Sequence, residues 1–483
     1  MSRPLPTSTP AAQGVDASGV QAFLDALEAA PDIEPHGLMI LRHGQVVSSG
    51  WWAPYAPDRL HLLYSLSKSF TSTAAGLAVA EGLIRLDDPV ISYFPEFEAD
   101  ITDPRSRAML VRHVASMASG HLAETYERAR VLDPQEVVRG FLLVPPERDP
   151  GTVFAYNQPA TYTLAAILQR VTGRSLSEYL RPRLLDPLGI GEVAWTRYPA
   201  DREIGFSGLH ATTDAIARLG LLYLRDGVWE GERLLPEGWV AEATRAHVAN
   251  ADGTPEGAVS DWQQGYGFQF WMSRHGYRGD GAYGQFCLVL PECDAVVAMT
   301  AATEQMQDVL NLVWEHLLPA FGPEPLPGER HEDTVLAQRL ARLALPPAAG
   351  KPAPPERAED WSGAEFAPYG GVCAGQPTLT AVGIGAGADE GGRRLTLTDD
   401  GAPLTLRLAG HGWNVEDDGP VPTAVSGGWT DADTLVVDVA FLETPHHLVV
   451  TCSLPDRTFT ARWRTAPLHA ESLHSLRAPR GSV

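Results

Sequence analysis

The chain has 483 residues, 44% of them hydrophobic, which exceeds the size at which one hydrophobic core stops growing, so two domains are expected. Its 37 Lys and Arg residues against 60 Asp and Glu residues give a net charge of -23, which argues against nucleic-acid and membrane-surface partners. Because no apolar signal segment or membrane-length apolar run is found, the sequence predicts a cytoplasmic protein.

The first two thirds of the chain mix strand-like and helical patterns. Residues 37–51 alternate around a His-Gly turn and predict a β-hairpin. Apolar residues recur at helical spacing from Ser65 until Gly82, which predicts a buried helix. Further helices are predicted at 162–171, 213–224 and 308–317, and further strands at 267–271, 285–290 and 295–300. Early and late strands with helices between them predict one sheet built from distant segments and flanked by helices.

The last third of the chain has a different character. Residues 345–357, LPPAAGKPAPPER, predict a semi-rigid linker between a domain of residues 1–344 and a domain of residues 358–483. Beyond the linker, short alternating runs separated by turn signals predict an all-β barrel or sandwich. The pair His446-His447 lies beside such a run and is interpreted as sheet packing, not as a metal site. The four cysteines lack a C-x-x-C spacing, so reduced thiols are expected.

Lysine is almost absent from this sequence. Of the 37 basic residues only Lys68 and Lys351 are lysines, and Lys351 lies in the linker. A buried ammonium can release its proton, whereas a guanidinium in a protein cannot. Lys68 follows Ser65 by three residues, which places the amine and the hydroxyl on one face of a helix. The flanking apolar and aromatic residues favour a desolvated amine, so Ser65 is the predicted nucleophile and Lys68 its proton acceptor.

The surrounding sequence resembles the serine β-lactamase-like proteins, which include class C β-lactamases, D-amino-acid peptidases, esterases and some acyltransferases. The resemblance begins at HLLYSLSKSFTSTAAGLAVAEGLIRLDDPVISYFPE and continues through GTVFAYNQPATYTLAAILQRVTG, GLHATTDAIARLGLLYLRDG and DGAYGQFCLVLPECDAVVAMT, in family order. It implies a mixed α/β (α+β) fold, in which helices and a helical subdomain flank an antiparallel sheet. The C-terminal β domain lies outside the resemblance.

The resemblance also implies roles for individual residues. Tyr156 occupies the tyrosine position of the family's Y-x-N motif and is expected to relay protons with the serine and lysine. The motif's asparagine position holds Gln158, and Asn157 lies between the two, so both amides are candidate substrate contacts.

The third family motif, K-T-G or H-x-G, is replaced by G-D-G ending at Gly281. Its usual cation is missing and Asp280 would repel a substrate carboxylate unless Arg278 reaches across, which disfavours β-lactams and favours neutral or cationic esters and amides. The open backbone at Gly281 is implied to place the Ala282 N-H beside the Ser65 N-H as an oxyanion hole.

The leading hypothesis is a serine hydrolase that cleaves a small ester, amide or short peptide through a covalent acyl-enzyme on Ser65, without metal or cofactor. Three alternatives stay open: an acyltransferase on the same scaffold, a hydrolase of β-lactams or D-amino-acid peptides, and a non-catalytic acyl-binding protein. The C-terminal domain is expected to have a structural, pocket-covering or dimerising role, so a homo-oligomer is one expectation.

Overall fold

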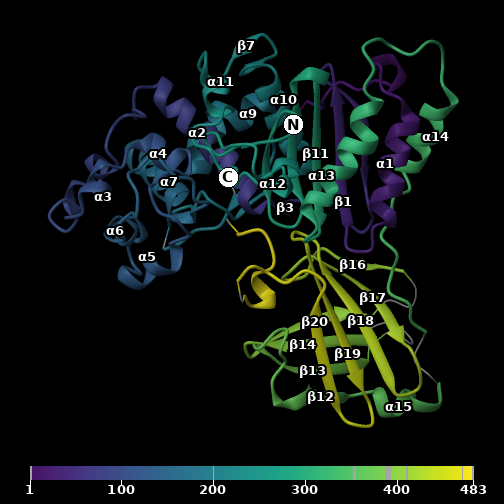
Figure 1. Cartoon of the computed structure of the whole chain (residues 1–483). Coiled ribbons are helices and arrows are strands. Elements are labelled where there is room, and N and C mark those ends of the chain that lie inside the picture. Colours follow the sequence, from purple (N-terminus) through teal and green to yellow (C-terminus); the bar gives the residue numbers. More distant parts are fainter. Residues whose placement is uncertain are drawn as a thin grey trace.

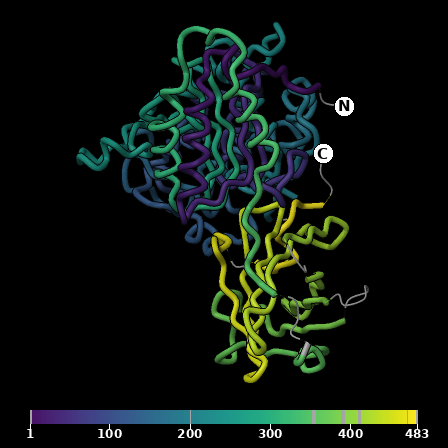
Figure 2. Tube along the Cα trace, turned by 90° about the vertical axis from the view of Figure 1, so that its right-hand side faces the viewer, coloured from purple at the N-terminus to yellow at the C-terminus, as the bar shows by residue number. Residues whose placement is uncertain are grey.

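The computed structural model describes residues 3–199, 201–351, 355–386, 393–408, 412–469 and 471–480. Two bodies of secondary structure are visible in Figure 1, a larger one of helices around a sheet and a smaller one made almost entirely of strands. The turned view in Figure 2 shows the strand-rich body at one end of the larger body. Within the described residues, none of the helices combines the length and apolar content that crossing a bilayer requires.

A six-stranded antiparallel sheet forms the centre of the larger body. Its strands follow the order β2-β1-β11-β10-β9-β8. They are β1 (Glu34–Arg42), β2 (Gln45–Trp51), β8 (Trp271–Met272), β9 (Tyr277–Gly281), β10 (Gln285–Leu290) and β11 (Ala295–Ala302). Since β1 lies between β2 and β11, the prediction of one sheet assembled from distant segments is confirmed. The turn between β1 and β2 has positive φ at His43 and Gly44, as a tight hairpin requires.

Both faces of this sheet are covered by helices. In β1, Leu38 and Ile40 face a core shared with α1 (Ala17–Ala29), α13 (Met306–Leu312) and α14 (His331–Leu340). The alternate residues Met39 and Leu41 face a second core shared with α2 (Ser67–Ala80) and α10 (Thr213–Leu224). The period of two along a strand therefore places apolar residues on both faces. This explains why β1 and β11 are apolar nearly throughout.

A helical subdomain extends to one side of the sheet (Figure 1). It comprises α3 (Pro104–Ala108), α4 (Val111–Ala115), α5 (Tyr126–Leu132), α6 (Val137–Leu143), α7 (Gln158–Thr172) and α8 (Leu176–Leu180). The short helix α9 (Asp186–Leu188) follows and lies beside α10. Smaller elements complete the body: β3 (His61–Leu62), β4 (Ala194–Trp195), β5 (Leu209–Ala211), β6 (Val228–Trp229), β7 (Glu232–Arg233), α11 (Trp239–Ala243) and α12 (Pro255–Val259).

The strand predicted at residues 267–271 is mostly wrong. Only Trp271 and Met272 form β8, and the next strand of the sheet is β9. Phe268 and Phe270 are buried, but Gln269 between them has a φ of 61°, which breaks the extended conformation. Phe268 and Phe270 pack into the core from a loop, although their apolar pattern in the sequence resembles that of a strand.

The second body is a nine-stranded sheet with the order β15-β14-β13-β12-β20-β19-β18-β17-β16. Its strands are β12 (Ala364–Pro368), β13 (Leu379–Ala386), β14 (Arg393–Asp399), β15 (Ala402–Arg407), β16 (Asn414–Glu416), β17 (Thr423–Trp429), β18 (Thr434–Phe441), β19 (His446–Ser453) and β20 (Thr458–Trp463), with the short helix α15 (Ala358–Trp361) before them. Asn414 in β16 donates a hydrogen bond of 3.1 Å to the Arg407 carbonyl in β15. The two outer strands therefore approach each other, and the sheet is a nearly closed barrel with its own apolar core.

The two bodies touch at several places. Leu345 is buried and its N-H donates to the Ala53 carbonyl, while Lys351 pairs with Trp429 of β17. Residues 345–351 thus run from one body to the other, and residues 352–354 of the predicted linker lie outside the described residues. The domain boundaries at 344 and 358 stay predictions. All four cysteines are free thiols.

Candidate active site

Ser65 lies at the entrance of α2, where the structure forms a 3-10 turn, Tyr64–Leu66, before the α-helix begins at Ser67. The residue before it, Tyr64, has a φ of 47°, a left-handed conformation that is uncommon for a bulky side chain. The Ser67 hydroxyl holds the turn, because it donates to the Tyr64 carbonyl and accepts a hydrogen bond from the Leu209 N-H. Ser65 itself is half-buried at this strained turn.

Lys68 is buried one helical turn after Ser65. Its Nζ lies 3.0 Å from Ser65 Oγ, 2.8 Å from Gln158 Oε1 and 2.7 Å from the Phe206 carbonyl oxygen. The Gln158 amide oxygen and the Phe206 carbonyl oxygen can only accept hydrogen bonds, so each accepts one N-H of a neutral Lys68 amine. The lone pair of that amine is then left for the Ser65 hydroxyl proton. Burial lowers the pKa of Lys68 to about 7, although the nearby carboxylates of Asp280 and Glu124 act in the opposite direction.

Tyr156 completes the group around the serine. The Lys68 Nζ lies 4.8 Å from the centroid of the Tyr156 ring, and the ring stacks on Trp271 at 5.3 Å. Burial raises the pKa of the Tyr156 phenol well above its usual value, and its hydrogen bond with Ser65 opposes that rise. At neutral pH the phenol is therefore protonated, so it can accept a hydrogen bond and can donate its proton.

The amides at the start of α7 are separated by the structure. The Gln158 side chain reaches Lys68, as described above, and is half-buried. Asn157 is fully buried, and its Oδ1 accepts hydrogen bonds from the backbone N-H and the hydroxyl of Thr125. The structure thus brings Gln158 to the site and keeps Asn157 away from it, so the predicted substrate contact through Asn157 has no geometric support.

Strand β9 passes directly against the nucleophile turn. A Cβ on Gly281 would lie 2.0 Å from the Leu63 carbonyl oxygen, and one on Gly279 would lie 2.4 Å from Ser69 Oγ. At position 281 the close atom is a backbone oxygen that cannot move aside, so glycine is required there. At position 279 the close atoms belong to the side chains of Ser69 and Leu66, which would have to shift. The predicted oxyanion residue Ala282 follows β9 immediately, in the turn to β10. The pairing of its N-H with the Ser65 N-H stays a prediction.

Arg278 and Asp280 lie on the same face of β9 and pair with each other. Arg278 Nε donates to Asp280 Oδ2 at 2.8 Å, and the guanidinium lies 4.4 Å from the Trp262 ring centroid. The Arg278 side chain is fully buried and also donates to the Asp261 carbonyl and the Ser273 hydroxyl. In this structure the Arg278 side chain is directed to Asp280 and to the Asp261 carbonyl, and its contact with a substrate carboxylate stays a prediction. Asp280 is buried with it, beside Lys68 and Tyr156.

Two further contacts of the site were not predicted from sequence. One is the Phe206 carbonyl, a loop acceptor that carries no sequence signal. The other is His446 of β19, whose Nε2 accepts a hydrogen bond of 2.6 Å from the Tyr64 hydroxyl. His446 Nδ1 donates to the Thr465 carbonyl at 2.9 Å, which fixes Nε2 as the acceptor. The C-terminal barrel thus contacts Tyr64, the residue that precedes Ser65.

A cavity of about 960 Å³ lies beside this turn, between the two bodies. Tyr64, which precedes Ser65, and Phe206, whose carbonyl accepts a hydrogen bond from Lys68, line it, whereas Ser65, Lys68 and Tyr156 do not. Its lining is mainly apolar and comes from both bodies, with Leu62, Tyr126, Tyr198 and Ile204 on one side and Pro420, Pro467, Leu468 and Leu476 on the other. The cavity can therefore accommodate a large apolar group near the turn that carries Ser65.

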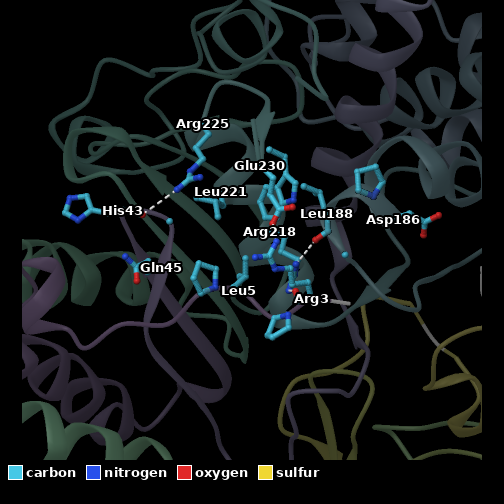
Figure 3. A pocket seen from close by; sticks show the side chains of 16 residues that line it. Arg3, Leu5, His43, Gln45, Asp186, Leu188, Arg218, Leu221, Arg225 and Glu230 are labelled. Atoms are coloured by element: carbon cyan, nitrogen blue, oxygen red, sulfur yellow. Dashed lines mark hydrogen bonds and ion pairs between the residues drawn. The ribbon is translucent and has the colours of Figure 1, made fainter. Parts of the chain in front are cut away.

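A second cavity of about 630 Å³ lies elsewhere, between the β1-β2 turn, α9 and α10 (Figure 3). None of the predicted catalytic residues lines it. Its most buried cation, Arg218, already pairs with Asp214 and donates to the Leu188 carbonyl. The first cavity is the candidate substrate site because two of its lining residues, Tyr64 and Phe206, adjoin Ser65 and Lys68.

Comparisons with known proteins agree with this geometry. A family model described as Beta-lactamase matches residues 20–318. The 6-aminohexanoate-dimer hydrolase of Paenarthrobacter ureafaciens is 30% identical over 311 residues, 57% of this chain and 76% of that protein. The lovastatin esterase of Penicillium rubens is 27% identical over 37% of this chain and 50% of its own length. The crystal structure of a penicillin-binding protein homologue from Caulobacter crescentus, 18% identical, superposes with a TM-score of 0.50 over 63% of this chain and 97% of that chain, and so shares the fold.

Proposed function

Because the chain belongs to the Beta-lactamase family, whose similar members here are serine hydrolases of esters and amides, we propose that it hydrolyses a small carboxylic ester or linear amide through an acyl-enzyme on Ser65. One observation carries the assignment of the nucleophile. The Lys68 Nζ lies 3.0 Å from Ser65 Oγ in a buried setting that lowers the pKa of the amine to about 7. A neutral amine beside a hydroxyl is a general base for acyl transfer.

The reaction we propose has two halves. Ser65 Oγ attacks the substrate carbonyl carbon while its proton passes to the Lys68 amine, and the backbone N-H groups of Ser65 and Ala282 receive the oxyanion. Collapse of the tetrahedral intermediate breaks the ester or amide bond, and the Tyr156 phenol delivers a proton to the departing alcohol or amine. Water then attacks the acyl-enzyme by the same route in reverse, which releases the acid and restores the Ser65 hydroxyl.

The substrate class follows from the charges around the site. Arg278 is engaged by Asp280, so β9 presents no free cation where a β-lactam carboxylate would need one. We therefore propose substrates without a carboxylate beside the scissile bond, with an apolar group in the cavity between the two bodies. The names of the relatives, a 6-aminohexanoate-dimer hydrolase and a lovastatin esterase, support linear amides and esters.

A substrate panel tests this proposal. Nitrophenyl esters of increasing acyl length, neutral linear amides, penicillins and cephalosporins would be compared by kcat/KM with the full-length protein. We expect turnover of esters or amides that improves with acyl length and is at least about 10-fold better than for any β-lactam, because one unpaired charge contact is worth about 1.4 kcal/mol or more. Turnover of β-lactams alone would contradict the substrate class and leave the nucleophile assignment intact.

Replacement of Tyr156 by phenylalanine tests the proton relay. We expect kcat to fall by roughly 10²- to 10³-fold, because removal of a positioned general acid usually costs this much. The ring stacking on Trp271 is kept, so KM and the melting temperature should change little. The measurement is steady-state kinetics on an ester with a good leaving group and on one with a poor leaving group. The loss should be larger for the poor leaving group, and equal losses would contradict a role in leaving-group protonation.

Gln158 offers a way to move the pKa of Lys68. In the Gln158→Glu variant a carboxylate would replace the amide oxygen 2.8 Å from Nζ, which should raise the pKa of Lys68 by about 1 to 3 units. The acidic limb of the kcat/KM profile should shift to higher pH by the same amount. The exposed Gln135→Glu variant adds the same charge away from the site and serves as the control. An unmoved limb in Gln158→Glu would show that Lys68 does not govern the pH dependence.

His446 is expected to position the nucleophile turn through Tyr64. The His446→Phe variant would leave the buried Tyr64 hydroxyl without its acceptor, and we expect kcat to fall by about 10-fold with little change in KM. In a Tyr64→Phe background the same change should have almost no further effect, because the shared hydrogen bond is already lost. Additive losses in the double variant would mean that His446 acts independently of Tyr64.

A further inference from the structure

Two histidines and a carboxylate converge where the central sheet meets the barrel. Glu34 Oε1 in β1 lies 3.2 Å from His36 Nε2 and 3.1 Å from His447 Nε2 of β19. Both histidines are 1% exposed. Among the described residues this is the one group of three or more histidine, cysteine or carboxylate side chains with ligand atoms close enough to share an ion. We propose that this group is a metal site that binds Zn²⁺ and joins the two bodies of the protein.

The hydrogen bonds of His36 direct a lone pair toward Glu34. His61 Nδ1 lies 3.1 Å from the Leu62 carbonyl and must donate to it, so His61 Nε2 is an acceptor. His36 Nδ1 lies 3.0 Å from that atom and therefore donates to it. In a neutral His36 ring, Nε2 then carries a lone pair that faces the carboxylate oxygen Oε1 of Glu34. Two acceptors at this distance repel each other unless a cation lies between them.

His447 has the same arrangement on the opposite side. Its Nδ1 lies 3.3 Å from Asp438 Oδ1, an ion-pair distance without hydrogen-bond geometry. With the ring proton on Nδ1, next to this carboxylate, the Nε2 lone pair also faces Glu34 Oε1. Metal-bound histidines usually donate their other ring N-H to a carboxylate, a carbonyl or another acceptor, which orients the ring. His61 is such a partner for His36, and Asp438 lies within ion-pair distance of His447. Arg464 holds the other oxygen of Glu34 at 2.9 Å and also pairs with Asp438, so it orients both carboxylates and leaves Oε1 unengaged.

The donor set and its spacing favour zinc. Two imidazoles and one carboxylate are a common zinc ligand set, and ligand atoms about 2.1 Å from zinc at tetrahedral angles lie about 3.4 Å apart. The distances of 3.1 and 3.2 Å are close to this value. The Tyr55 hydroxyl lies 3.1 Å from His447 Nε2, and the Tyr55 ring stacks on His36 at 3.6 Å, so it covers a further side of the site. The burial of the two histidines, and the position of the group outside the cavity near Ser65, favour a structural role for the ion.

The proposed metal site lies at the junction between the two bodies. Glu34 and His36 belong to the central sheet and His447 belongs to the barrel, so the ion would bind both bodies at once. None of the three ligands lines the cavity beside Ser65, and the proposal therefore does not depend on the proposed hydrolase activity. Zinc binding should stabilise the junction between the bodies, because an ion that binds only the native state shifts the folding equilibrium.

The test uses the full-length protein, stripped of metal by a chelator and then titrated with ZnCl₂ in a calorimeter. We expect one equivalent to bind and the melting temperature to rise on zinc addition. Cobalt(II) added in place of zinc should give the intense visible absorption of a four-coordinate ion. The Glu34→Gln and His447→Gln variants, which keep side-chain size and polarity, should lose the tight equivalent, and Asp438→Asn should weaken it by about 10- to 100-fold. The exposed His331→Ala variant is the matched control and should bind zinc as the wild type does.

The wild-type titration decides the proposal even if a variant fails to fold. Uptake of less than one equivalent, or cobalt spectra that match those of the solvated ion, would overturn it. Equal zinc affinity in folded Glu34→Gln and His447→Gln would also overturn it, because the ion would then bind elsewhere. In those cases the cluster is a proton-linked ion-pair network with Arg464.

Discussion

Replacement of Ser65 by alanine is expected to lower kcat/KM on the best ester substrate by on the order of 10⁴-fold or more. The Ser65 hydroxyl is the atom that forms the acyl-enzyme in the mechanism proposed above, and the remaining polar groups cannot replace it. Only one oxygen atom is removed from a half-buried side chain, so the fold and the melting temperature should be kept. The measurement is kcat/KM by absorbance with matched protein concentrations.

Covalent labelling provides an independent readout for the same variant. A fluorophosphonate probe should modify the wild type once, at Ser65, and should not modify Ser65→Ala. The Ser92→Ala variant removes an exposed hydroxyl outside the site and should keep both labelling and turnover. If folded Ser65→Ala is still labelled, or retains more than about one hundredth of the activity, another residue is the nucleophile and the proposed mechanism fails.

Replacement of Lys68 by arginine is expected to lower kcat/KM by on the order of 10³-fold. The guanidinium keeps the positive charge and the hydrogen-bond donors but cannot release a proton at accessible pH, so it cannot receive the proton of Ser65. The Lys68→Met variant removes the charge as well as the base and should lose a similar amount. A large loss of activity in Lys68→Met together with near-normal activity in Lys68→Arg would show that the positive charge is required and the basicity is not.

The pH dependence of kcat/KM tests the same general base, Lys68. Because the folded-state pKa of Lys68 is about 7, the reactive neutral amine is lost as pH falls through 7, and wild-type kcat/KM should then fall about 10-fold per pH unit. The free energy of unfolding also depends on the protonation of Lys68. Between about pH 7 and 10.5 the unfolded chain holds a proton on Lys68 that the folded protein does not, so the free energy of unfolding rises with pH across this window.

Comparison of the wild type with Lys68→Arg isolates this contribution, since arginine stays charged in both states. Their difference in free energy of unfolding should change by about 1.4 kcal/mol per pH unit between pH 7 and 10, in favour of the wild type at higher pH. Denaturant titrations at several pH values measure it. A difference that does not change with pH would mean that the lysine is not desolvated.

The sequence by itself determined the features that depend on local periodicity. The spacing of Ser65 and Lys68 on one helix face follows from 3.6 residues per turn, and the scarcity of lysine singles out Lys68 by composition alone. Helix α10 was predicted with its observed bounds, because both its capping threonine and its apolar face are local signals. Tyr156 is far from Ser65 and Lys68 along the chain, and its place in the site was predicted from the resemblance to a known family.

Only the tertiary structure decided which distant groups meet. It selected Gln158 instead of Asn157 as the amide at Lys68, and it buried Arg278 against Asp280 where a substrate contact had been expected. It also brought His447 of the barrel to Glu34 in β1. Such contacts depend on how whole elements pack, on register and on the path of loops, and none of these leaves a period in the sequence. A helix fixes neighbours within one or two turns, whereas a junction between two sheets is fixed only when both have folded.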